Sequence, residues 1–248
     1  EAFVSWHNVV KVPAGRIVRM GKDTNFWEIG VGPCGPCSEI YVDLGEERGC
    51  VSPDCKVGCE CDRYLEIWNL VFIQFFKDEQ GNYTPLEQKG IDTGFGLERV
   101  ASVMQGVSSN FDTDLLREIM DYTAGLFGLV YGREEKVDVA LKVIADHSRA
   151  ITFAITDGAL PSNEGRGYVI RRLLRRAVRF GRLLGIQEPF LDRVAGAVVR
   201  QMGHTYPELV ERRDHVIRVI RSEEERFGET LNQGTDMLNR IIMETKKA

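Results

Sequence analysis

The segment Ile91–Val100, IDTGFGLERV, contains the residue types of a ligand-binding turn. Asp92 precedes two glycines, Gly94 and Gly96, and Arg99 falls on the first turn of an expected helix. Glycines let a ligand lie against the backbone, and a guanidinium binds phosphate through paired hydrogen bonds. Asp92 could hold an ammonium group. The alternative is an ordinary strand–turn–helix with a surface arginine, and so short a glycine pattern does not decide between the two.

Six cysteines fall within 28 residues, and the rest of the chain contains none. Four of them lie in a loop rich in Gly, Pro and Asp, and four such thiolates can bind zinc tetrahedrally. The candidate zinc ligands are Cys50, Cys55, Cys59 and Cys61. The alternative is a set of reduced thiols in an insertion loop. Cys34 and Cys37 are interpreted as structural, with a redox pair or a distant metal ligand as the lesser alternative.

Residues 165–185 contain seven arginines and no acid, whereas the whole chain has a net charge of −5, so the other residues sum to −12. Helical spacing places most of these arginines on one face and apolar side chains on the other. Like charges at i,i+4 repel, and RNA phosphates would supply the counter-charge. The alternative is a solvated face paired with acids elsewhere. The RNA-binding candidates are Asn163, Arg166, Arg171, Arg172, Arg175, Arg176 and Arg179.

Strand-like runs precede these helical patterns. We expect strands at Arg16–Met20, Glu39–Asp43 and Ile67–Phe76, then a turn at 80–82 into a strand near Tyr83–Leu86. Ile67–Phe76 is almost continuously apolar, which predicts a buried strand.

Helical periodicity begins near Gly96 and continues at 112–128, 138–158 and 167–185, and a long helix is expected from about Glu208. Strands first and helices afterwards predict an α+β fold in two domains, 1–106 and 107–248.

Several segments in order resemble one family. Ile91–Val100 resembles motif 3 of class II aminoacyl-tRNA synthetases, and its flanks resemble the alanyl-tRNA synthetases. The matching segments are Asn25–Gly30, Gly32–Ile40, Glu66–Phe75, Asp92–Arg99 and Asp146–Arg179. The resemblance implies part of a class II antiparallel sheet with helices, followed by an all-α tRNA-recognition domain.

The resemblance also implies a role for each matching residue. Trp27, Asn69 and Val71 would line an alanine pocket, with core packing as the alternative for Trp27. Asp92 would bind the α-ammonium group. Gly94 and Gly96 would approach the ligand, and Arg99 would hold the phosphates of ATP, which is used with Mg²⁺. Asn163 would read a G·U pair in the minor groove of the tRNA(Ala) acceptor stem.

Taken together, the resemblance implies an alanine–tRNA ligase, which activates alanine with ATP and transfers it to tRNA(Ala). Motifs 1 and 2 would lie before Glu1, so we expect a fragment of a longer cytoplasmic enzyme that is inactive alone. The alternatives are a non-catalytic, tRNA-binding synthetase-like module and a zinc-stabilised structural domain. No run approaches the length of a membrane span. The sequence leaves the oligomeric state open.

Overall fold

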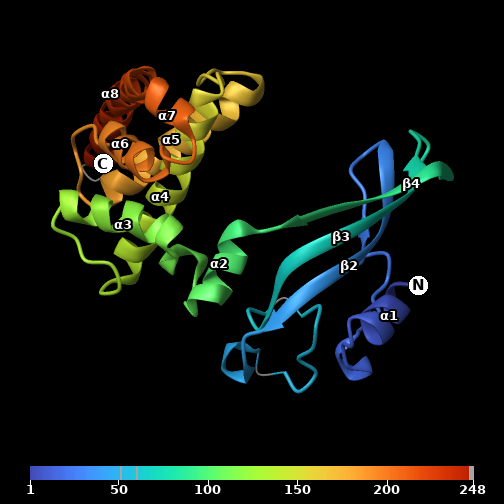
Figure 1. Ribbon diagram of the computed structural model, residues 1–248. Helices are drawn as coiled ribbons and strands as arrows, with labels where there is room; N and C mark the ends of the chain where they lie inside the picture. The colour runs from blue at the N-terminus through green and yellow to red at the C-terminus, as the bar shows by residue number, and fades with distance from the viewer. Residues whose placement is uncertain (51, 60, 246–248) are drawn as a thin grey trace. The chain divides into compact units, whose positions relative to one another are not determined.

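A computed structural model describes residues 1–50, 52–59 and 61–245. The chain divides into two compact units, Glu1–Asn110 and Phe111–Ala248. The first contains a four-stranded antiparallel sheet, and the described elements of the second are helices, which confirms the α+β class (Figure 1).

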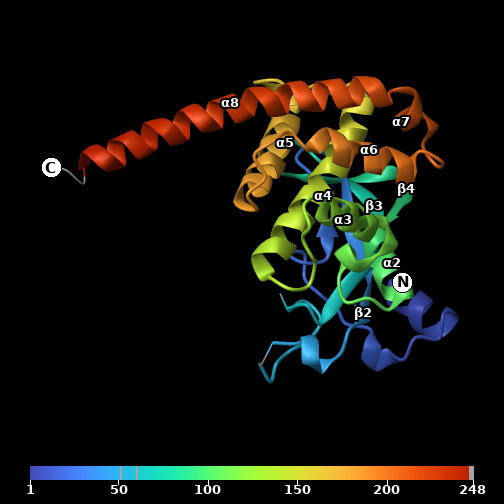
Figure 2. The ribbon, with the colours of Figure 1, turned by 90° about the vertical axis from the view of Figure 1, so that its left-hand side faces the viewer.

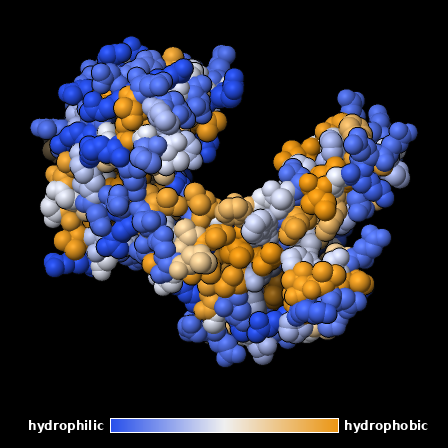
Figure 3. Space-filling model, in the orientation of Figure 1, coloured by the Kyte–Doolittle hydropathy of each residue, from blue (hydrophilic) through white to orange (hydrophobic). Residues whose placement is uncertain are grey.

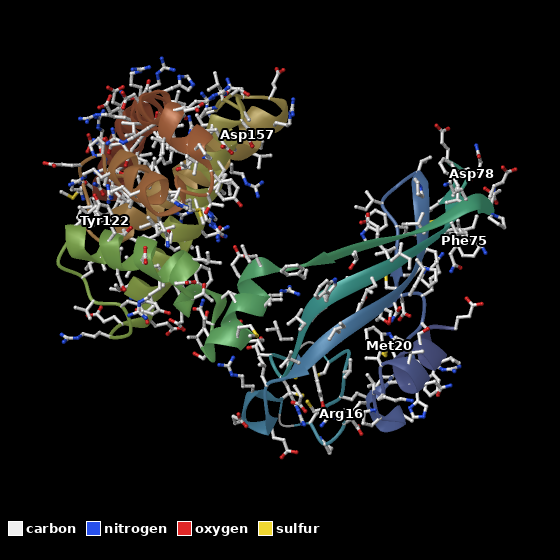
Figure 4. The ribbon with its side chains drawn as sticks, in the orientation of Figure 1. Arg16, Met20, Phe75, Asp78, Tyr122 and Asp157 are labelled. Atoms are coloured by element: carbon white, nitrogen blue, oxygen red, sulfur yellow. The ribbon has the colours of Figure 1, made fainter. Side chains whose placement is uncertain are left out.

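The sheet has the order β1-β2-β3-β4. Its strands are β1 (Phe26–Trp27), β2 (Gly32–Asp43), β3 (Tyr64–Lys77) and β4 (Tyr83–Phe95). The expected turn at 80–82 joins β3 to β4. Asp78, labelled in Figure 4, accepts hydrogen bonds there from the backbone and side-chain nitrogens of Asn82 at 2.8 and 3.0 Å, and Gly81 has a φ of 83°. The expected strands at Glu39–Asp43, Ile67–Phe76 and Tyr83–Leu86 are confirmed within longer strands.

Two irregularities interrupt the pairing of β2 with β3, one between Cys34 and Cys37 and one between Ile40 and Tyr41. At the first, the backbones approach so closely that a Cβ added to Gly35 would lie 1.8 Å from the Phe72 carbonyl oxygen. Glycine is therefore required at position 35. Such bulges re-aim the side chains that follow them.

Two expectations about the first unit are wrong. Arg16 and Met20, labelled in Figure 4, do not delimit a strand, because the chain forms a 3₁₀ helix at Ala14–Arg16 and then continues without strand pairing. Strand β3 is also not buried throughout: Val71 is buried, but Trp68 and Phe76 are 37% and 38% exposed. Figure 3 accordingly shows hydrophobic side chains, in orange, on the surface over the strands.

Short helices complete the first unit. They are α1 (Ala2–Val4), the π-helix Ser5–Val9, the 3₁₀ helix Glu46–Arg48 and α2 (Leu97–Gln105), which follows β4 directly. Trp6 joins the N-terminal helices to the sheet, since its indole nitrogen donates to the Ser38 hydroxyl at 2.6 Å.

The second unit packs its helices around one hydrophobic core. After the 3₁₀ turn Asn110–Asp112, the helices are α3 (Asp114–Leu126), α4 (Glu135–Thr156), α5 (Gly165–Leu183), α6 (Leu191–Met202), α7 (Pro207–Glu211) and α8 (Arg213–Thr245). Leu141, Ile144, Leu174, Val194 and Ile220 are fully buried within this core. Each such side chain contributes about 1.5–3 kcal/mol to stability.

The expected helices are confirmed to within a few residues, except that the long helix predicted from Glu208 is interrupted at Arg212. Helix α8 packs along the second unit through residues such as Val216 and Ile220, and its C-terminal part extends past the other helices of that unit (Figure 2). None of the helices among the described residues is both long and apolar enough to cross a membrane.

Candidate functional site

One face of the sheet brings together most of the residues expected to bind alanine and ATP. Asn69 of β3 lies opposite Gly94 of β4, and Val71 lies opposite Asp92. Directly opposed residues of an antiparallel pair have Cβ atoms about 4.5–5.5 Å apart and point to the same side. The spacing of two along each strand therefore places all four on one face.

This face is open at β4. A Cβ added to Gly94 would meet no atom within 4 Å, so the backbone is accessible to a ligand there. Asp92 is exposed and also borders a shallow hollow of about 400 Å³, which Ile73 and Gly90 line with it. The Asp92 side chain is thus accessible to a ligand without rearrangement of the sheet.

Arg99, on the first turn of α2, folds back over the glycine that precedes the helix. A Cβ added to Gly96 would lie 3.2 Å from Cγ and Cδ of Arg99, so a larger residue would push the arginine away. Nη1 of Arg99 donates to the Glu66 carbonyl oxygen at 2.9 Å and lies 3.7 Å from the Glu66 carboxylate. The side chain is 45% exposed, so its guanidinium retains donors that can bind phosphate.

Three polar residues on the same face, Glu39, Tyr41 and Glu66, were not predicted from the sequence. Asn69 Nδ2 donates to Glu39 Oε1 at 3.2 Å and to Glu66 Oε1 at 3.5 Å, and the Tyr41 hydroxyl donates to Glu39 Oε2 at 2.7 Å. Burial and the hydrogen bond to Glu39 raise the pKa of Tyr41 above its usual value. The phenol therefore remains a hydrogen-bond donor at neutral pH.

The irregularity between Ile40 and Tyr41 explains why Glu66 joins this group. Tyr41 lies opposite Glu66, although Ile40 lies opposite Trp68, so β3 contains one extra residue at this point. Without the extra residue, strict alternation would place Glu66 on the face of the sheet that carries Trp68, and Asn69 would lie on the other face. The alternation of Cys37, Glu39 and Tyr41 along β2 was the signal that could have identified two of the three residues.

The carbonyl oxygen of the Asn69 side chain is buried and has no hydrogen-bond partner in the described part of the chain. Buried polar atoms are nearly always hydrogen-bonded, so a buried acceptor without a partner is unusual. A ligand with an N–H donor, such as an ammonium group, would satisfy this oxygen. It is the feature of the face that fits an amino-acid ligand most directly.

Trp27 lies in β1 opposite Gly35 of β2, and 39% of it is exposed. Such exposure does not fit the alternative of ordinary core packing. Cys37, which lies opposite Val71, accepts a hydrogen bond from the Trp27 backbone, and burial raises the pKa of its thiol. Cys34 is 1% exposed, and its thiol pKa is likewise raised by burial. Neither thiol is activated as a nucleophile.

The four cysteines of the loop between β2 and β3 converge. Their sulfur atoms all lie within 4.8 Å of one another, with Cys50 3.5 Å from Cys59 and Cys55 3.6 Å from Cys61. Four Zn–S bonds of about 2.3 Å in a tetrahedron place the sulfurs about 3.8 Å apart, so this set fits zinc. Backbone N–H groups, including that of Arg63, lower the pKa of Cys61 to about 6, whereas burial and the neighbouring thiols raise the pKa of Cys55 to about 11. Cys61 is therefore the member of the set whose thiolate is favoured without a metal.

An ion pair closes the base of this cysteine-rich loop. Arg63 Nε and Nη2 donate to the two oxygens of Asp43 at 2.8 and 3.0 Å, and the Leu44 backbone nitrogen donates to the Arg63 carbonyl at 2.8 Å. The ends of β2 and β3 are therefore held together independently of any metal. Residues 51 and 60 of this loop lie outside the described residues.

The arginines of α5 separate into two groups. Arg171 and Arg175 each approach Glu223 of α8 to 3.0 Å, and the side chain of Glu223 is 6% exposed. The negative charge that offsets this pair of arginines therefore comes from within the chain. For these two residues, this agrees with the alternative that the arginines pair with acids elsewhere in the sequence. In contrast, Arg172, Arg176 and Arg179 are exposed and form no ion pair with the described residues. Arg166 is exposed at the start of the same helix.

Asn163 lies in the polar loop before α5 and is exposed. Nη1 of Arg171 donates a hydrogen bond to the side-chain oxygen of Asn163. Asn163 and Arg171 are thus brought together in the second unit.

The fold and the site define a class. A family model of tRNA synthetases class II (A) matches residues 1–248, and the chain belongs to this family. The match spans both units, so the family does not set residues 107–248 apart as the separate all-α domain that we expected.

Individual relatives carry a more specific name. The chain is 82% identical over 248 residues to the alanine–tRNA ligase of Pelotomaculum thermopropionicum, a match that covers 100% of this chain and 28% of the relative. It is 74% identical over 251 residues to that of Carboxydothermus hydrogenoformans, covering 100% and 29%, and 57% identical over 247 residues to that of Acetivibrio thermocellus, covering 100% and 28%. The chain therefore spans somewhat more than a quarter of the length of these relatives.

Proposed function

We propose that this chain is the part of an alanine–tRNA ligase that binds alanine, ATP and the acceptor stem of tRNA(Ala). The observation that carries the proposal is the open sheet face where Asn69, Val71, Asp92 and Gly94 meet, with Arg99 at its edge. An ammonium-binding carboxylate, a small apolar contact and a phosphate-binding arginine on one surface suit an amino acid and a nucleotide held side by side.

Each residue has a role in the proposed reaction. Asp92 and the unpartnered oxygen of Asn69 would hold the α-ammonium group of alanine, and Val71 and Trp27 would contact its methyl group. The alanine carboxylate would then attack the α-phosphorus of ATP, forming alanyl-adenylate and releasing pyrophosphate. Arg99 would bind the phosphates and stabilise the charge that develops on them.

Magnesium bound with ATP supplies positive charge to the phosphates in such a reaction. Besides Asp92, Glu39 and Glu66 on this face offer the oxygen ligands that magnesium prefers, and Asn69 Nδ2 donates a hydrogen bond to each of these two glutamates. Removing either acid would leave Asn69 with fewer partners and allow its amide to turn away from the ammonium position.

The second unit would hold the RNA. The exposed Arg166, Arg172, Arg176 and Arg179 would contact phosphates, and Asn163 would read the G·U pair of the acceptor stem. We further assign a zinc ion to the four loop cysteines, where it would order the connection between β2 and β3. A cytoplasmic location, as for translation enzymes in general, is part of the same proposal.

A non-hydrolysable alanyl-adenylate analogue tests the catalytic proposal against a tRNA-binding module without catalysis. Isothermal titration calorimetry with the chain should show binding that weakens roughly 10- to 100-fold in Asp92→Asn, because a charge-assisted hydrogen bond is lost. Asp78→Asn, at the far β3–β4 turn, is the matched control and should bind normally. RNA binding without analogue binding would instead favour the non-catalytic module, and binding of neither would favour a zinc-stabilised structural domain.

A further inference from the structure

The amide of Asn163 is not free to present either end to a ligand. Its contact with Arg171 uses the side-chain oxygen, because a guanidinium carries only donors and must face an acceptor. The Nδ2 group of Asn163 therefore points away from Arg171. The two N–H donors of Nδ2 are therefore the part of the amide that faces a ligand, and the oxygen keeps one further lone pair beside Arg171.

Arg171 is itself held in place by Glu223 of α8. Its Nη2 donates to Glu223 Oε2 at 3.1 Å, its Nε lies 3.0 Å from Oε1, and its side chain is 17% exposed. Glu223 is buried and also accepts a hydrogen bond from Arg175 Nε at 3.0 Å. A buried carboxylate between two guanidinium groups cannot leave without exposing uncompensated charge, so it fixes the position of Arg171.

The backbone of the loop is fixed as well. The Ser162 nitrogen donates to the Gly167 carbonyl at 3.1 Å, and the Ser162 hydroxyl donates to the Glu164 carbonyl at 2.8 Å. A Cβ added to Gly167 would lie 2.3 Å from the Leu160 carbonyl oxygen, so the loop closes tightly on the start of α5. Asn163 is thus an exposed side chain on an ordered loop.

We propose that Glu223 and Arg171 are positioning residues that hold the Asn163 amide so that it meets RNA as a hydrogen-bond donor. Its counterpart would be an acceptor in the minor groove of the acceptor stem: a pyrimidine O2, a purine N3 or a ribose 2′-hydroxyl. The inference rests on the proposed tRNA function. It also removes Arg171 from the arginines that contact phosphate and gives it a role in specificity.

The first measurement needs no RNA. The side-chain ¹H–¹⁵N signals of Asn163, assigned by their loss in Asn163→Ala, should show the rigidity of the backbone in the wild-type chain. In Arg171→Met they should show the relaxation of a mobile side chain. Arg175 still neutralises Glu223 in this variant, which protects the fold. Arg172→Met, at the next position and exposed, is the matched control and should leave the signals unchanged. Unchanged signals in Arg171→Met would overturn the inference.

The second measurement compares binding of the chain to acceptor-stem hairpins that contain a G·U or a G·C pair. Asn163→Asp keeps the oxygen that Arg171 binds but has no N–H donor, and its added charge affects both hairpins alike. The wild-type chain should bind the G·U hairpin more tightly. The Kd for the G·C hairpin divided by the Kd for the G·U hairpin should fall roughly 5- to 10-fold in Asn163→Asp and in Arg171→Met, as expected for one lost hydrogen bond. Arg172→Met should weaken both complexes and preserve the ratio.

The possible failures are distinct. If Asn163→Asp retains the wild-type ratio, the amide acts as an acceptor and the inference is wrong. If the wild-type chain binds both hairpins equally, the proposed reading of the G·U pair fails, and the inference fails with it even if the nuclear magnetic resonance result holds. If Asn163→Asp loses the preference for the G·U hairpin but Arg171→Met keeps it, Asn163 still recognises the G·U pair. Arg171 and Glu223 are then not positioning residues.

Discussion

Replacing the buried Glu224 by glutamine should change how the stability of the helical unit depends on pH. Glu224 of α8 is 3% exposed and accepts hydrogen bonds at 3.0 Å from the backbone nitrogens of Phe190 and Leu191, at the start of α6. Burial raises its pKa to about 7, with a smaller contribution from Asp192, although the two N–H groups and Arg182 act in the opposite direction.

The sign of the effect follows from the raised pKa. Between the ordinary value of 4.5 and about 7, the folded state keeps a proton on Glu224 that the unfolded state has released. The contribution of Glu224 to stability is therefore fully present below pH 4.5 and is lost as the pH rises to 7. The difference between the two pKa values corresponds to about 3 kcal/mol. Carboxylates with a lowered pKa, such as Asp146 beside His147, affect the pH dependence of stability in a more acidic range. Their stabilising contribution is lost only as the pH falls below their ordinary pKa.

Urea denaturation followed by circular dichroism at 222 nm is a suitable assay, since most of the helical residues lie in the second unit. The wild-type chain should lose about 3 kcal/mol of unfolding free energy between pH 4.5 and 7 relative to Glu224→Gln. Glutamine cannot ionise and keeps one acceptor for the start of α6. Glu225→Gln, at an exposed neighbouring position, should follow the wild-type profile. Parallel profiles for the wild type and Glu224→Gln would refute the reasoning.

Two further predictions concern the first unit. Gly35→Ala should destabilise the sheet by about 2–3 kcal/mol or more, because its Cβ would collide with the Phe72 carbonyl oxygen. Gly90→Ala is the control, because a Cβ added there meets no atom within 4 Å. Urea unfolding of the first unit can be followed by tryptophan fluorescence, since all three tryptophans lie in it. Equal unfolding midpoints for the two variants would contradict the argument. The chain should also retain one zinc ion by mass spectrometry after dialysis, whereas Cys61→Ser should retain less than half. A wild-type content below one-half per chain would argue against the zinc site.

Local patterns predicted the parts of the fold that local physics determines. Helical periodicity identified α3, α4 and α5 to within three residues at each end, because their apolar stripes face a single core. The apolar run of β3 correctly predicted a strand but wrongly predicted its burial. A run of apolar side chains reports the preference of the backbone, whereas exposure depends on what covers each face, and Trp68 and Phe76 are only partly covered.

The sheet site was predicted in part for a related reason. Asp92, Gly94 and Arg99 lie within eight residues of each other, so sequence spacing alone places them together. Glu66 reaches the same face only because β3 contains an extra residue opposite Tyr41, and nothing in the local sequence marks that position. Similarly, the counter-charge for Arg171 comes from Glu223, 52 residues later in the chain, so the balance of charge on α5 could not be read from α5 itself.

Helix α8 connects stability and recognition through two adjacent acids. Glu223 and Glu224 are both buried, yet successive helical positions point about 100° apart. Glu223 therefore meets Arg171 and Arg175 of α5, whereas Glu224 meets the backbone at the start of α6. A shift of α8 by one residue would break both contacts together, so the same helix register that completes the core also determines where Arg171 lies. The position of Asn163, which would read RNA under the proposed function, then depends on the packing of the core behind Arg171.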